Sequence, residues 1–190
     1  MKNNDNTQNF KNNYKQLFNI LNGRSKMKYF LILTTIMVTG LFAQNVNPET
    51  NWTYDQSTSQ AFYYLEDLTI DGISADGDGL APPDALNGDC YANPNTCDVI
   101  GAFNANGDCV GWAYAGFIQN VMTVPLSGND GTVTQFLQNG ESAELRVYDA
   151  ANGSILSVTP GDVLPGWSFN GAFTISGTST ANNTFGCTDA

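Results

Sequence analysis

The chain contains no histidine among its 190 residues. This excludes Ser-His-Asp and Cys-His catalytic arrangements and zinc sites with imidazole ligands. A carboxylate pair could still support glycoside hydrolysis, for example Asp98 with Glu141 or Glu144, but among 18 acidic residues some pair always looks suitable. No glycine-rich phosphate loop leads from a strand into a helix. The sequence therefore predicts neither catalysis nor nucleotide binding.

Basic residues are almost missing after residue 43. Arg146 is the one basic residue there and faces 17 acids, which gives a formal charge of −16. Phosphate backbones and anionic lipids bind proteins through Lys and Arg, so nucleic acid and anionic membranes are poor partners. An acidic surface suits a divalent cation, and it equally serves to keep an exported domain in solution.

Long apolar runs are also missing. Residues 27–43 open with a charged start at Lys28, continue with an apolar core of roughly a dozen residues and end at the small residue Ala43, which is the plan of a signal peptide. The run is shorter than the roughly 20 residues that cross a bilayer, so no membrane span is predicted. Residues 1–26, rich in Asn and Lys, are interpreted as a non-native extension or a wrongly assigned start ahead of Met27.

The segment 44–180 shows short alternating runs in place of a helical repeat. Apolar and polar residues alternate over four to eight positions, between clusters of Gly, Asn, Asp and Pro. Roughly eight short strands at about ten-residue spacing predict an all-β fold, an antiparallel β-sandwich of jelly-roll or Ig-like type. The expected strands include 60–72, 99–103, 109–117, 120–126, 133–137, 143–148, 154–158 and 171–177.

Two of these runs are predicted to form β-hairpins. "AFNANGDCV" (102–110) and "VYDAANGSIL" (147–156) each place an Asn-Gly step between strands, and both residue types tolerate the positive φ of tight turns. An internal duplication and two independent hairpins both explain the likeness. Val110 and Trp112 alternate along one strand and are expected to share a core face. The expected core residues of the two hairpins are Val99, Ile100, Phe103, Val110, Trp112, Leu145, Val147 and Tyr148.

Four cysteines suit an exported chain, in which disulfides persist. Cys90 and Cys97 enclose the short loop "YANPNT" and are predicted to form a local disulfide. Cys109 lies in an apolar strand and is expected either to be a buried thiol or to pair with another cysteine. Cys187 has no obvious partner.

Calcium is the one cofactor that the sequence suggests. The loop "DGISADGDGLAPPD" brings together four aspartates, and calcium takes six to eight oxygen ligands from such flexible loops. The spacing does not match an EF-hand, and a solvated acidic loop is the alternative. The predicted calcium ligands are Asp71, Asp76, Asp78 and Asp84.

Exposed aromatic rings would suit a glycan, because they stack on the apolar faces of sugars. Trp112 fits the core better, whereas Trp167, in "LPGWSFNG", is the predicted exposed ligand-binding residue.

The stretches "FYYLEDLTIDG", "DVIGAFNANGDCVGW", "TVPLSGNDG" and "LRVYDAANGSI", taken in order, resemble a module of exported proteins from marine Bacteroidota. The resemblance covers residues 52–176, and "CYANPNTC" is an insertion relative to it. Residues 181–190 form a linker whose end, "GCTDA", resembles the start of acidic, cysteine-containing repeats in type IX secretion cargo. The resemblance implies a longer multidomain chain, a disulfide partner for Cys187 beyond Ala190, and a surface β-sandwich of undefined binding role.

Together these observations predict a non-catalytic, secreted or cell-surface binding or adhesion module whose partner is a glycan or a surface protein. Two alternatives stay open. One is a carbohydrate-binding module of a truncated polysaccharide-degrading enzyme, and the other is a structural spacer in a repetitive adhesin.

Overall fold

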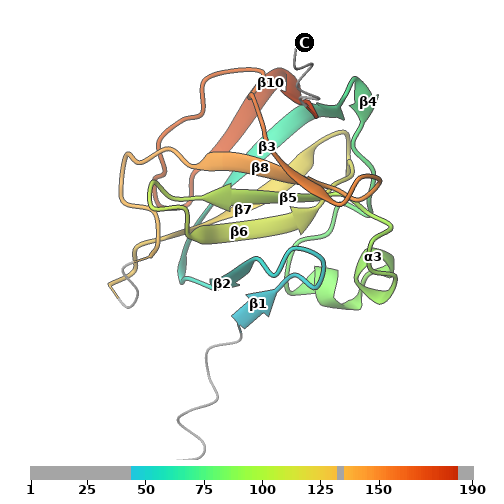
Figure 1. The fold of residues 1–190 in the computed structure, drawn as a ribbon. Helices are drawn as coiled ribbons and strands as arrows, with labels where there is room; N and C mark the ends of the chain where they lie inside the picture. Colours follow the sequence, from blue (N-terminus) through green and yellow to red (C-terminus); the bar gives the residue numbers. More distant parts are fainter. Residues whose placement is uncertain (1–43, 132–134, 184–190) are drawn as a thin grey trace, which may run out of the picture. The chain divides into compact units, whose positions relative to one another are not determined.

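The computed structural model describes residues 44–131 and 135–183, and this part of the chain is nearly all strand. The predicted all-β class is confirmed (Figure 1). In chain order the elements are β1 (Gln44–Val46), β2 (Thr53–Asp55), β3 (Ser59–Ile70), β4 (Ile73–Ser74), η1 (Asp84–Asn87), α3 (Asp89–Ala92), β5 (Val99–Phe103), β6 (Cys109–Tyr114), β7 (Met122–Gly128), β8 (Glu144–Asp149), β9 (Ser154–Ser157) and β10 (Ala172–Ala181).

Two four-stranded sheets enclose the main core and form the predicted sandwich. One sheet has the order β10-β3-β4, with β7 also paired to β3, and the other has the order β6-β5-β8-β9. Most pairings are antiparallel, but β10 and β3 run parallel. β10 follows the strands of the second sheet in the sequence and pairs with β3 in the first sheet.

The core has two parts. Between the sheets, β3 contributes Tyr63 and Leu65, which pack with Val124 of β7 and with Ile100 and Val147 of the second sheet. A second cluster lies on the other face of that sheet, where the β1–β2 pair and the short helices cover it. Full burial of an aliphatic side chain contributes about 1.5–3 kcal/mol. All eight expected core residues are buried, Val99, Phe103, Trp112 and Tyr148 in the second cluster and the other four between the sheets.

The expectation that Val110 and Trp112 share a face is wrong. Val110 belongs to the core between the sheets, whereas Trp112 belongs to the outer cluster. A bulge explains this, because Ala102 pairs with Gly111 but Phe103 pairs with Cys109, which leaves Val110 as an extra residue. One extra residue reverses the alternation of a strand.

Both predicted hairpins are present, as β5–β6 and β8–β9. In each turn the glycine alone of the Asn-Gly step has positive φ, 84° at Gly107 and 63° at Gly153. Asn106 and Asn152 stay at negative φ, so only the glycine half of the turn prediction holds. In the first turn the buried Asn104 side chain accepts hydrogen bonds from the backbone N–H groups that follow it.

The expected strand at 133–137 is not seen as a strand among the described residues. Leu137 makes one isolated bridge to Gly128 and is buried, and residues 132–134 lie outside the description.

Several predictions fall outside the described residues: the extension 1–26, the signal peptide 27–43, Cys187 and the repeat that begins with "GCTDA". A compact unit begins at Gln44, where the predicted signal peptide ends. No helix in 44–131 or 135–183 has the length and apolar character needed to cross a membrane.

Candidate functional site

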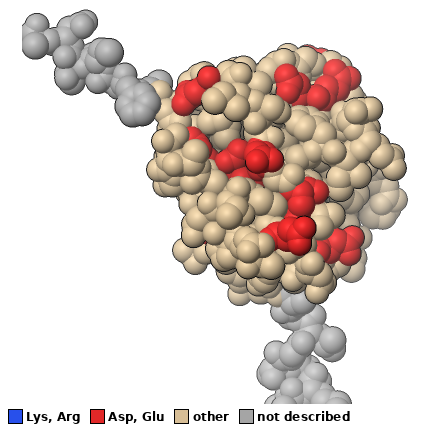
Figure 2. Space-filling model, turned by 90° about the vertical axis from the view of Figure 1, so that its right-hand side faces the viewer, with Lys and Arg blue, Asp and Glu red and all other residues tan. Residues whose placement is uncertain are grey.

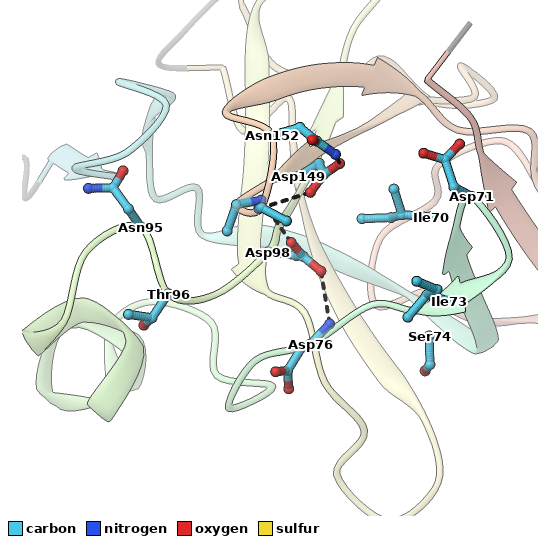
Figure 3. A pocket seen from close by; sticks show the side chains of 12 residues that line it. Ile70, Asp71, Ile73, Ser74, Asp76, Asn95, Thr96, Asp98, Asp149 and Asn152 are labelled. Atoms are coloured by element: carbon cyan, nitrogen blue, oxygen red, sulfur yellow. Dashed lines mark hydrogen bonds between the residues drawn. The ribbon is translucent and has the colours of Figure 1, made fainter. Parts of the chain in front are cut away.

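Three loops that are far apart in the sequence line one cavity of about 340 Å³. The β3–β4 hairpin contributes Asp71 from its turn and Ile73 from β4, the disulfide loop contributes Asn95 and Thr96, and the β8–β9 turn contributes Asn152, among other residues. In Figure 3, Asn95 and Thr96 lie on one side of the cavity and Ile70 and Ile73 on the other. Asp98 and Asp149 lie between them. One side therefore presents the apolar side chains of Ile70 and Ile73 beside Asp71 and Ser74, and the other sides carry carboxylates, amides and a hydroxyl.

Asp98 joins the segment that follows β4 to the β8–β9 turn at the centre of the cavity. Its carboxylate accepts hydrogen bonds from the Asp76 N–H at 2.9 Å and from the Ala150 N–H at 2.9 Å (Figure 3). Burial raises the pKa of Asp98, against the two backbone hydrogen bonds, and nearby Asp149 and Asp76 raise it further. Asp98 is thus a positioning residue that sets the distance between the two loops.

Asp149 lines the cavity on the side of the β8–β9 turn, and Asn183 binds its carboxylate from outside the lining. The Asp149 carboxylate accepts from the Asn152 Nδ2 at 2.7 Å and from the Asn183 Nδ2 at 3.0 Å. Burial alone would raise the pKa of Asp149, but these and backbone hydrogen bonds outweigh it and lower the pKa. Asn183 also donates twice to the Asp71 carboxylate, both at 2.9 Å, so one amide links the two turns.

The four aspartates predicted to bind calcium do not form one cluster. Asp71 and Asp76 line the cavity, whereas Asp78 accepts from the Leu80 and Cys90 N–H groups and Asp84 is exposed at the start of η1. Within the described ranges, no three acidic or cysteine side chains are placed to hold a metal ion together. Calcium binding stays a prediction, which calorimetric titration of the chain with calcium chloride would test.

Trp167 is not the exposed residue that the sequence predicted. It is 5% exposed, and its ring packs on Gly128, where a Cβ would overlap the indole. Its Nε1–H donates to the Leu126 carbonyl at 3.4 Å. The flanking Pro and Gly residues suggested an exposed loop, but the side chain turns inward.

The predicted disulfide between Cys90 and Cys97 is confirmed, with a Cα–Cα distance of 5.7 Å. It closes the loop that carries Asn95 and Thr96 into the cavity. Cys109 is the free cysteine of the described residues and is partly buried, which matches one of its two predicted states. Burial raises the pKa of the Cys109 thiol to about 12, so it is protonated at neutral pH.

The carboxylate pair considered for hydrolysis is not formed. Asp98 precedes β5, whereas Glu144 pairs with Phe103 at the other end of β5 and Glu141 binds the Ala105 N–H beyond it. A five-residue strand separates these groups by about 17 Å, too far for a pair acting on one bond.

Acidic side chains are spread over the face that carries β4 and α3, and Figure 2 shows no basic side chain on that face. Arg146 is the one basic residue within 44–131 and 135–183; it is paired with Glu144 at 3.3 Å and lies 4.3 Å from the centre of the Phe103 ring. Of the four predicted aspartates only Asp71 and Asp76 line the cavity, and the sequence did not indicate Asn95, Thr96 and Asn152, because only the fold brings them beside these aspartates.

No family model matches this chain, and no curated protein or solved structure matches it either.

Proposed function

We propose that residues 44–183 are a non-catalytic binding module of an exported protein and that the cavity binds a glycan. The observation that carries the proposal is the cavity itself, with an isoleucine wall opposite a wall of oxygen and amide groups. A sugar ring has the same two-sided character, because its C–H groups form apolar faces and its hydroxyls form a polar rim. A volume of about 340 Å³ lies in the range of small-ligand sites.

Each wall has a distinct role in this proposal. Ile73 is 75% exposed and offers its side chain to a C–H face. Asp76 lines the cavity, and its carboxylate makes no hydrogen bond within the described part of the chain, so it is available to accept from a sugar hydroxyl. Asn95, Thr96 and Asn152 supply both donors and acceptors.

Three observations support the location in an exported protein. The Cys90–Cys97 disulfide suits an oxidising compartment. The signal-peptide pattern at 27–43 and the resemblance to secreted Bacteroidota modules point the same way.

A glycan array probed with the full chain tests the proposal, followed by calorimetry on the glycans it selects. Asp76→Ala should weaken binding about tenfold, the equivalent of one lost hydrogen bond of about 1.4 kcal/mol. Asp84→Ala is the matched control, because Asp84 is exposed and does not line the cavity. An array without selective binding, or equal affinities for the two variants, would refute a glycan site here.

A further inference from the structure

The parallel pair β3–β10 has a geometry that matters when the chain is stretched. Ala172 pairs with Phe62 at one end and Ala181 pairs with Ile70 at the other, with a single irregularity between Ile175 and Thr178. The chain enters β3 at Ser59 and leaves β10 at Ala181. Because the strands are parallel, these two points lie at opposite ends of the pair, as Figure 1 shows.

We propose that this domain is a load-bearing link, in which β3 and β10 act as a shear clamp when tension passes through the chain. Tension at the two points slides the strands along each other. The evenly spaced hydrogen bonds of a parallel ladder are then loaded together and not one after another. Forced unfolding depends on the rate of crossing that barrier, so simultaneous loading raises the force needed.

The load reaches the clamp after the N-terminal strands β1 and β2 have separated. β1 and β2 are antiparallel, with Gln44 opposite Asp55, so tension opens them pair by pair at low force. The load then reaches the start of β3. There the Ser57 hydroxyl donates to the Gly128 carbonyl at 2.6 Å, and β7 pairs with the first half of β3 on the side away from β10.

Side chains reinforce the clamp where the ladder is irregular. The Thr178 hydroxyl donates to Asp67 at 2.8 Å, and the Gly177 N–H donates to Glu66 at 3.3 Å. Both bonds join β10 to β3 beside the register shift.

The exit from β10 is fastened as well. The Asp71 N–H donates to the Ala181 carbonyl at 2.9 Å, and the backbone and side chain of Asn183 both donate to the Asp71 carboxylate. These bonds hold the departing chain to the turn after β3, at the end where tension is applied. A domain of this design passes force between its neighbours in a longer chain, whether or not the cavity binds a ligand.

Single-molecule pulling of the full chain between two handle domains tests the proposal by direction. End-to-end pulling should give one main rupture and a length gain on the order of 400 Å, at about 3.6 Å per residue. In the second pulling direction, Ile73, which is 75% exposed, is replaced by an unnatural amino acid with a side chain for selective coupling, and one handle is attached there. The other handle follows the C-terminus. Both handles then lie at one end of the strand pair, so β10 peels from β3, and the force should fall at least about twofold. Equal forces in the two directions would overturn the clamp.

A pair of variants tests the fastening at the exit. Asn183→Ala should lower the end-to-end rupture force and leave the length gain unchanged. Asn106→Ala is the matched control, because Asn106 is an exposed turn residue and alanine keeps the hydrogen bond that its backbone N–H donates. Equal forces for the two variants would show that Asn183 carries no load and would overturn its place in the clamp.

Discussion

Replacement of Trp167 by alanine separates a core role from a ligand-contact role for this side chain. The indole is 5% exposed, packs on Gly128 and belongs to the core between the sheets. Truncation of a buried tryptophan costs about 3–5 kcal/mol. In a domain of this size each kcal/mol lowers the melting temperature by about 2–4 °C, so we expect a fall of about 10 °C.

Gly128 provides the second half of this experiment. A Cβ at this position would overlap the Trp167 ring, so Gly128→Ala alone forces the indole to move and should cost about 1–3 kcal/mol. In the Trp167→Ala background the ring is absent, and the added methyl group enters the vacated space. The double mutant should therefore be more stable than the sum of the two single effects, by at least about 1 kcal/mol.

Urea and thermal unfolding of the full chain, followed by near-UV circular dichroism, measure these differences. Val163→Ala is the control in the same segment, because Val163 is 85% exposed and its replacement should change stability by less than about 0.5 kcal/mol. Wild-type stability for Trp167→Ala, or strict additivity in the double mutant, would refute the packing argument.

Two further predictions concern the cavity. Reduction of the Cys90–Cys97 disulfide should lower the free energy of unfolding by about 2–3 kcal/mol, as expected for so short a loop, and should weaken glycan binding. Calorimetry with and without reductant measures both effects. Unchanged affinity for the glycan would show that the disulfide loop takes no part in binding. In a carboxyl ¹³C NMR titration Asp98 should protonate at higher pH than Asp149, because burial raises the first pKa and hydrogen bonds lower the second. Protonation of Asp98 therefore favours the folded state as the pH falls through its raised pKa. The stability that Asp149 contributes is instead lost as the pH falls through its lowered pKa. The reverse order of titration would contradict the structure.

The sequence alone determined the elements that depend on neighbouring residues. Alternation predicted the strands around the two hairpins, glycine marked the turn positions with positive φ at Gly107 and Gly153, and a seven-residue separation predicted the Cys90–Cys97 bridge. These features are local, because a pleated strand, a tight turn and a short disulfide loop are each specified by a few adjacent side chains.

Only the tertiary structure decided which distant segments meet. The bulge that separates Val110 from Trp112 depends on pairing with β5, and the inward turn of Trp167 depends on the space that Gly128 leaves for its ring. The parallel return of β10 to β3 and the meeting of Asp71 with Asn183 join residues more than a hundred positions apart. A sequence pattern indicates which side of a segment is apolar and where a turn lies. Which other segment packs against that apolar side depends on the packing of the whole core. The cavity and the β3–β10 clamp both result from this long-range packing.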